Sequence, residues 1–168
     1  MTAVTARLAV AEKARLCMGA DSWRIPPFPG TDGGALTLSD GPHGLRKQAG
    51  PFPGPGLPAT CFPAPSALAS CWDTALVRQV GDAIGWEARA QEVDLVLGPG
   101  VNIKRSPLCG RNFEYFSEDP WLAGRLGRAV VEGIQAQGVG ACVKHFAANN
   151  QETGTCGSSR PPRTATTG

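Results

Sequence analysis

The chain has 168 residues and a formal net charge of +2, with 16 Lys and Arg against 14 Asp and Glu. This length fits one domain of ordinary size, and the nearly balanced charge excludes the basic surface typical of a nucleic-acid-binding protein. No apolar run reaches the roughly eighteen residues of a membrane span. The first twenty residues carry Arg7, Glu12, Lys13 and Arg15 instead of an apolar core, which is unlike a secretory signal and predicts a cytoplasmic location.

Six cysteines and two histidines are present, and no cysteine pair has C-x-x-C spacing. We therefore expect no metal site. Cys61, Cys71 and Cys142 have apolar neighbours in the sequence, which predicts structural thiols in apolar surroundings instead of disulfides. The chain has no G-x-S-x-G nucleophile motif and no complete dinucleotide-binding glycine loop, so we expect no cofactor.

Strands and helices are expected to alternate along the chain. The expected elements, in chain order, are an amphipathic helix at 5–18, a loop at 20–35, a strand at 36–39, an irregular Pro- and Gly-rich loop at 47–60, a candidate short strand at 60–63, a helix at 74–91, a strand at 94–97, a helix at 120–137 and a strand at 140–144.

The two long helices have the clearest signals. Asp73 is a favourable N-cap for the first, in which apolar residues recur at helical spacing. Asp119 followed by Pro120 marks the start of the second, and Gly138 marks its end. Strands and helices that alternate with short links predict parallel βα units, and hence an α/β fold.

Three of the expected strands run into polar loops. The loops are 39–46 (SDGPHGLR), 98–103 (GPGVNI) and 144–152 (KHFAANNQE). Because parallel strands place their carboxyl ends at one edge of a sheet, where α/β proteins bind ligands, the loops predict one shared site.

Individual residues in these loops leave alternatives open. Asp40 suits a ligand contact or a turn cap, and Arg46 a ligand contact or a solvated loop charge. Arg111 lies among aromatic residues, a combination that suits either a polyhydroxylated ring or a loop before a helix. Lys144 and His145 suit a general base, a phosphate clamp or a surface pair.

Four segments together resemble the ordered motifs of glycoside hydrolase family 3 β-glucosidases. They are the three loops above and 110–120 (GRNFEYFSEDP), within residues 1–152. The β-N-acetylhexosaminidase branch carries K-H-F-P-G-H-G in the last segment, so the chain is more similar to the β-glucosidases. The resemblance implies an N-terminal domain over 1–152 that forms part of a (β/α)₈ barrel, about the first four βα units, with its site at the carboxyl ends of the strands.

The resemblance also implies roles for individual residues. Asp40, Arg111, Lys144 and His145 would bind the non-reducing sugar of a β-glucoside or oligosaccharide, and Arg46 would be a further sugar-site residue. Retaining enzymes of this kind need a nucleophile and an acid/base carboxylate. The family nucleophile commonly lies in an S-D-W motif on a later strand, and the chain has no such motif. We therefore expect no catalytic residue in this chain and no activity of the chain alone.

Three other interpretations stay open. The chain can be a non-catalytic sugar-binding half-domain, a β-xylosidase-type member of the family, or a fragment that associates with the missing remainder of the enzyme. The resemblance ends near residue 152, and 153–168 has no apolar period, so we expect a disordered, non-native tail, as after a frameshift near codon 153. Half a barrel also leaves apolar surface and strand edges uncovered, which predicts aggregation.

Overall fold

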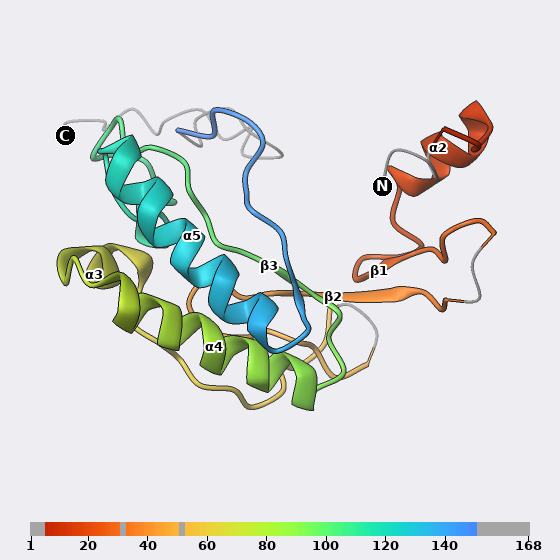
Figure 1. Cartoon of the computed structure of the whole chain (residues 1–168), viewed down its shortest axis with the longest axis horizontal. Coiled ribbons are helices and arrows are strands. Elements are labelled where there is room, and N and C mark those ends of the chain that lie inside the picture. Colours follow the sequence, from red (N-terminus) through yellow and green to blue (C-terminus); the bar gives the residue numbers. More distant parts are fainter. Residues whose placement is uncertain (1–5, 31–32, 51–52, 151–168) are drawn as a thin grey trace, which may run out of the picture.

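The computed structural model describes residues 6–30, 33–50 and 53–150 (Figure 1). These residues form an α/β structure around one mixed sheet with the strand order β1-β2-β3-β4. The strands are β1 (Arg24–Ile25), β2 (Leu36–Asp40), β3 (Leu95–Leu97) and β4 (Gly140–Ala141). The helices are α2 (Val10–Leu16), α3 (Pro65–Ser70), α4 (Thr74–Ala90) and α5 (Pro120–Ala136), with a 3₁₀ turn, η1, at Asn112–Glu114.

The predicted parallel βα units are confirmed. β2 pairs in parallel with β3, and β3 in parallel with β4, while β1 is antiparallel to β2. α4 connects β2 to β3, and α5 connects β3 to β4. Each crossover helix returns the chain to the same end of the sheet, so the carboxyl ends of β2, β3 and β4 lie at one edge.

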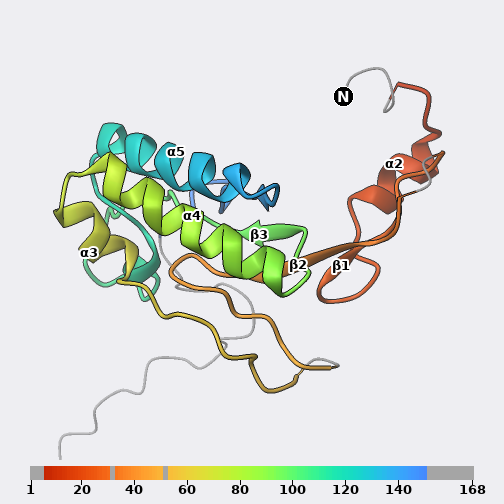
Figure 2. The same ribbon diagram turned by 60° about the horizontal axis from the view of Figure 1, so that its bottom comes forward.

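The core lies between the sheet and the two long helices, which run side by side (Figures 1 and 2). Val77 and Ile84 on α4, Leu126 and Ile134 on α5, and Val96 on β3 are almost completely buried. Along each helix these residues are seven or eight positions apart, or two turns, so they share one face. The helical periodicity in the sequence therefore identified most of the buried stripe, although Leu76, which the same periodicity includes, is 44% exposed.

Both predicted helix caps are present. The Asp73 carboxylate accepts hydrogen bonds from the amides of Ala75, at 2.8 Å, and Leu76, at 3.0 Å. The Asp119 carboxylate accepts a hydrogen bond from the amide of Trp121, at 2.9 Å. Gly138 follows α5 with a φ of +76°, a conformation that costs glycine little.

Of the predicted strands, the candidate at 60–63 was wrong and the strand at 140–144 was too long. No strand forms at 60–63, because Phe62 donates its amide hydrogen to the carbonyl of His43 and Thr60 donates to the Glu87 carboxylate. The strand predicted at 140–144 contains only Gly140–Ala141. Beyond it the ladder cannot continue regularly beside Pro99, which has no amide hydrogen.

The N-terminal region also differs from the prediction. The loop expected at 20–35 contains β1, a two-residue strand that is too short to show a sequence period. The helix expected at 5–18 is limited to Val10–Leu16, and none of its residues is buried. α2 lies away from α4 and α5 in both views (Figures 1 and 2). Within the part of the chain that the structure describes, Val10 and Ala11 of α2 are exposed and Leu16 is only partly buried.

The prediction of apolar surroundings for Cys61, Cys71 and Cys142 was wrong. All three are exposed free thiols, whereas Cys109 is buried. Cys71 caps the end of α3, where its thiol contacts the carbonyl of Leu68 at 2.8 Å. Apolar neighbours in the sequence do not bury a residue at a helix end, because burial depends on what packs over that end.

The edges of the sheet differ from those of a simple half-barrel. β1 covers the free edge of β2, while no described strand pairs with the far edge of β4. No described helix has the length and apolar character needed to cross a membrane. The predicted tail at 153–168 lies outside the described residues.

We expect the contact between α4 and α5 to tolerate no added methyl group at Gly81. A Cβ atom there would lie 2.5 Å from the carbonyl oxygen of Val130, so Gly81→Ala forces the helix backbones apart and should cost about 1–3 kcal/mol. Gly124→Ala is the matched control, because a Cβ at Gly124 meets no atom within 4 Å and alanine should stabilise α5 by up to about 1 kcal/mol. Thermal loss of the far-ultraviolet helical signal measures both. Equal effects of the two substitutions would contradict the close contact.

We also expect the isolated chain to bind a hydrophobic dye and to self-associate. Several large apolar side chains are strongly exposed, and apolar surface of this kind favours association where it is contiguous. They include Val10, Trp72, Trp86, Leu108, Trp121 and Phe146. Dye fluorescence and sedimentation velocity measure the two properties. A monodisperse monomer that does not increase the fluorescence of the dye would show that these apolar side chains are covered in solution.

Candidate functional site

An ion pair joins the carboxyl ends of two strands. Asp40 ends β2, Lys144 lies just beyond β4, and the Lys144 ammonium is 2.7 Å from Asp40 Oδ1. The backbone of Lys144 is held beside the end of β3, because its amide donates to the carbonyl of Pro99 and its carbonyl accepts from the amide of Val101. Both charged side chains are partly buried, with 25% of Asp40 and 16% of Lys144 exposed.

Glu114 links this ion pair to Arg111. Glu114 belongs to η1, and only 5% of its side chain is exposed. Its Oε1 accepts a short hydrogen bond from Arg111 Nε, and its Oε2 lies 3.5 Å from the Lys144 ammonium. A buried carboxylate between two cations fixes both of them, and its burial is tolerable only because it is paired.

The imidazole of His145 lies against Arg111. Arg111 Nη2 is 2.5 Å from His145 Nε2, and the Tyr115 hydroxyl is 3.1 Å from His145 Nδ1. A guanidinium donates hydrogen bonds and cannot accept them, so Nε2 must be the unprotonated nitrogen. The contact therefore selects the neutral tautomer with hydrogen on Nδ1, which can donate to Tyr115 or to Asn102 Oδ1 at 3.3 Å.

Asn102 positions the backbone of His145. The side-chain nitrogen of Asn102, Nδ2, donates to the backbone carbonyl of His145 at 3.0 Å. Its side-chain oxygen, Oδ1, accepts from the backbone amide of His145 at 2.7 Å. Asn149 donates to the Tyr115 hydroxyl at 3.0 Å. Burial raises the pKa of the Tyr115 phenol, so this hydroxyl stays protonated at neutral pH. His145 is thus held in place by contacts to its backbone and to both nitrogens of its ring.

Arg46 lies at the solvent side of the same cluster. Its guanidinium is 3.5 Å from Asp40 Oδ2, and 72% of the side chain is exposed. Its backbone amide donates to the carbonyl of Asp40 at 2.8 Å, which fixes the loop after β2. Arg46 is therefore close to the ion pair but free to change its side-chain position.

The structure brings all five predicted site residues together: Asp40, Arg46, Arg111, Lys144 and His145. The sequence analysis quoted four further residues of this cluster within motifs but gave them no role: Asn102, Glu114, Tyr115 and Asn149. A charged residue inside the aromatic run 113–116 was a usable signal for Glu114. The contacts of Asn102 span more than forty residues of sequence, and no local pattern predicts them.

The cluster presents charged donors and acceptors at a partly buried surface. Asp40 offers carboxylate lone pairs, while Lys144, Arg111 and Arg46 offer N–H donors. A ligand with many hydroxyl groups can use both kinds of partner. Within the described ranges, no group of three or more His, Cys, Asp and Glu side chains is arranged to hold a metal ion.

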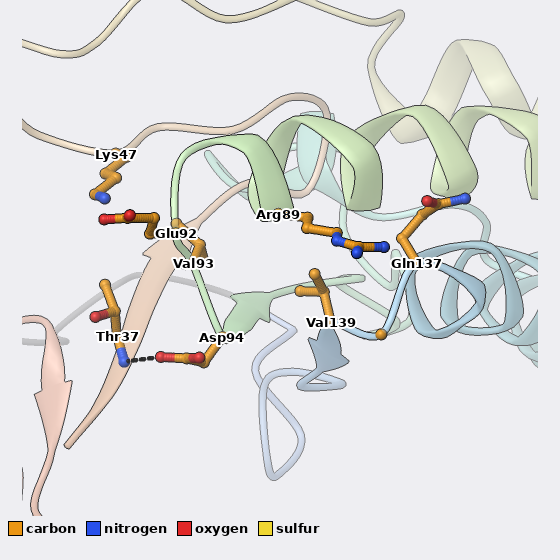
Figure 3. A pocket seen from close by; sticks show the side chains of 9 residues that line it. Thr37, Lys47, Arg89, Glu92, Val93, Asp94, Gln137 and Val139 are labelled. Carbon is orange, nitrogen blue, oxygen red and sulfur yellow. Dashed lines mark hydrogen bonds between the residues drawn. The ribbon is translucent and has the colours of Figure 1, made fainter. Parts of the chain in front are cut away.

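A cavity of about 670 Å³ lies elsewhere, at the amino ends of the strands (Figure 3). Thr37, Asp94 and Val139 line it, with Lys47, Arg89 and Glu92. The Thr37 amide donates to the Asp94 carboxylate at 2.7 Å, and Lys47 donates to the carbonyl of Gln91. Some of its polar groups thus hold the fold together. The mixed charges of this cavity favour no ligand class. We therefore assign the candidate site to the cluster described above, called the Asp40 cluster from here on, which consists of Asp40, Arg46, Arg111, Glu114, Lys144 and His145.

Comparison with known proteins identifies relatives that cover most of the chain. Residues 54–166 match the family model of the glycosyl hydrolase family 3 N terminal domain. The thermostable beta-glucosidase B of Acetivibrio thermocellus is 53% identical over 150 residues, which are 87% of this chain and 20% of the relative. The exo-alpha-(1->6)-L-arabinopyranosidase of Bifidobacterium longum is 48% identical over 151 residues, with the same coverage.

Solved structures give the same result. The Bifidobacterium adolescentis GH3 beta-glucosidase is 48% identical with a TM-score of 0.77, over 89% of this chain and 21% of that one. Beta-glucosidase 3B of Thermotoga neapolitana, in complex with alpha-D-glucose, is 41% identical with a TM-score of 0.76. This match covers 90% of the present chain and 23% of the Thermotoga chain. The chain spans about a fifth of the length of the curated relatives it matches. By its sequence and its structure, the chain belongs to glycosyl hydrolase family 3.

Proposed function

We propose that the chain is the N-terminal part of the (β/α)₈ catalytic domain of a retaining β-glucosidase, and that the Asp40 cluster binds the non-reducing glucosyl residue. The observation that carries this proposal is the convergence of Asp40, Arg111, Lys144 and His145 at the carboxyl ends of parallel strands. The relatives include beta-glucosidases that are 53% and 48% identical to the chain, which supports the substrate class.

The partial barrel is supported by the topology. Three parallel strands joined by two crossover helices are consecutive βα units, which is the repeat of a barrel, and a complete barrel needs about 250 residues. The far edge of β4, which no described strand covers, is where the next parallel strand would pair.

Each residue of the cluster has a role that its contacts suggest. Asp40 accepts hydrogen bonds from sugar hydroxyls, and Lys144 and Arg111 donate to sugar oxygens. Glu114 keeps the two cations apart and in place, and Arg46 closes over the bound ring from the rim. Since Asp40, Arg111 and Lys144 are held by ion pairs before the ligand arrives, these three side chains lose little entropy on binding.

The nucleophile and the acid/base belong, in this proposal, to parts of the enzyme other than residues 1–152. Retaining hydrolysis needs two carboxylates about 5–5.5 Å apart that reach the sugar carbon and the leaving oxygen. Both oxygens of Glu114 are taken up by Arg111 and Lys144, and Asp40 pairs with Lys144 and Arg46. These carboxylates are therefore assigned to binding.

A pentopyranoside is a second candidate substrate. Two relatives named exo-alpha-(1->6)-L-arabinopyranosidase are 48% and 47% identical to the chain. An L-arabinopyranosyl ring matches D-glucose at the 2- and 3-hydroxyls, but its 4-hydroxyl has the opposite configuration and it has no hydroxymethyl group. Competition between D-glucose and L-arabinose for the same site distinguishes the two candidates.

We expect Asp40→Asn to weaken D-glucose binding. The substitution keeps the shape of the side chain but removes the charge that hydrogen-bonds sugar hydroxyls and pairs with Lys144. Hydrogen bonds to charged groups contribute about 1.5–3 kcal/mol, so the dissociation constant should rise by about tenfold or more. Saturation-transfer NMR on the full chain measures the affinity.

Asp21→Asn is the matched control for this experiment. Asp21 also pairs with a cation, Arg24, at 2.6 Å, but in the exposed segment before β1. This variant should bind glucose as the unchanged chain does. Equal affinity of the Asp40→Asn variant and the unchanged chain would remove Asp40 from the sugar site.

We expect the purified chain to hydrolyse no 4-nitrophenyl β-D-glucopyranoside. Nucleophilic and acid–base catalysis supply most of the rate, and sugar-binding residues cannot replace them. The Asp40→Asn chain, prepared in parallel, corrects for host glycosidases because a contaminant is unaffected by the substitution. Release of nitrophenol above that control would place a working carboxylate pair inside this chain. Activity that appears only on addition of the separately expressed remainder would support association of the two parts.

A further inference from the structure

A second cleft, of about 450 Å³, is lined by residues outside the Asp40 cluster. Its walls come from α3, from the turn after α3, and from the segment 116–118 together with Lys104. The cleft adjoins the segment that carries Glu114, because Ser66 Oγ lies 3.2 Å from the carbonyl oxygen of Asn112 and 3.4 Å from that of Tyr115. Its volume is within the range of about 300–1,000 Å³ that is usual for small-molecule sites.

Trp72 is the notable residue of this cleft. It is the single residue between Cys71, which caps the end of α3, and Asp73, which caps the start of α4. Its φ is +56°, and its side chain is 73% exposed. A left-handed residue after a helix is usually glycine, and a bulky residue there is strained. Folding alone therefore favours glycine at this position, and an exposed indole adds little packing in return.

Polar groups share the lining of this cleft with Trp72. Lys104 donates to Ser66 Oγ at 2.7 Å, and burial lowers the pKa of the Lys104 ammonium. Ser70 and Ser117 place hydroxyl groups in the lining, and the exposed Glu118 adds a carboxylate. An ammonium, hydroxyls and a carboxylate beside a flat apolar ring match a sugar, whose hydroxyls lie at its rim and whose C–H groups form its faces.

We propose that this cleft is a second carbohydrate-binding site, in which Trp72 stacks on one ring of a β-linked oligosaccharide while Lys104 and Glu118 bind its hydroxyls. The ligand class rests on the proposed function, but the site itself is independent of Asp40. Trp86 and Trp121 are also exposed, yet neither has a positive φ and neither lines this cleft. They provide controls of the same side-chain type.

The test uses cellotetraose and the full chain with Asp40→Asn, so that binding at the first site is weakened. We expect saturation-transfer NMR to detect cellotetraose in this background. Adding Trp72→Gly should weaken the affinity by about tenfold or more, since the stacking surface is lost. Adding Trp72→Phe, which keeps an aromatic ring, should retain most of the affinity. Adding Trp86→Ala should leave it unchanged.

The glycine variant separates binding from folding. Glycine relieves the left-handed backbone, so Trp72→Gly should keep or raise the temperature at which the helical far-ultraviolet signal is lost. Loss of that signal together with binding would assign Trp72 to folding and overturn the proposal. Absence of cellotetraose binding in the Asp40→Asn chain, no effect of Trp72→Gly, or an equal effect of Trp86→Ala would also overturn it. If Asp40→Asn leaves glucose binding intact while Trp72→Gly removes cellotetraose binding, the first site fails and the second stands.

Discussion

The close contact between α4 and α5 is the constraint on which the rest of the structure depends. At Gly81 the backbone of α5 approaches so closely that a methyl group does not fit, and Gly85 faces Ile134 in the same way. Such an approach locks the two helices together as one layer over the sheet. Because each helix is also the crossover between two parallel strands, the packed pair holds β2, β3 and β4 in register. The carboxyl ends of β2 and β4 therefore meet beside β3, and Asp40 reaches Lys144.

The charged residues of the resulting cluster differ in burial and in their partners. Glu114 is the most buried of its carboxylates and holds two cations, whereas Asp40 and Arg46 face solvent more openly. Removing a buried partner leaves an unpaired charge, so the positions of Arg111 and Lys144 depend on each other through Glu114. Arg111 in turn selects the tautomer of His145, and Asn102 fixes the backbone on which that imidazole is carried. A site of this kind is preorganised by residues that need not touch a ligand themselves.

The sequence distance between bonded residues explains which parts of this arrangement could be predicted. Asp73 and Asp119 cap helices through contacts two or three residues away, so their sequence signals were sufficient. The candidate strand at 60–63 had favourable residues, but its amides bond to His43 and Glu87, which are distant in sequence. The same reason applies to Cys61 and Cys71, whose exposure depends on which segments pass over them. Local pattern predicts what is bonded locally, and it fails where the partner lies far along the chain.

The sequence alone determined the helices α4 and α5, their buried stripes, the parallel order of the strands and the loops at which a site would form. These features follow from periodicity, caps and the geometry of crossover connections, all of which operate over short stretches of chain. Only the tertiary structure decided that Glu114 joins Arg111 to Lys144, that Asn102 holds His145, and that Trp72 is exposed in a strained turn. The contacts of Glu114 with Lys144 and of Asn102 with His145 depend on distances between segments that lie tens of residues apart, and such a distance exists only once α4 and α5 have packed on the sheet. The exposure of Trp72 depends in the same way on which segments pack beside the turn between α3 and α4.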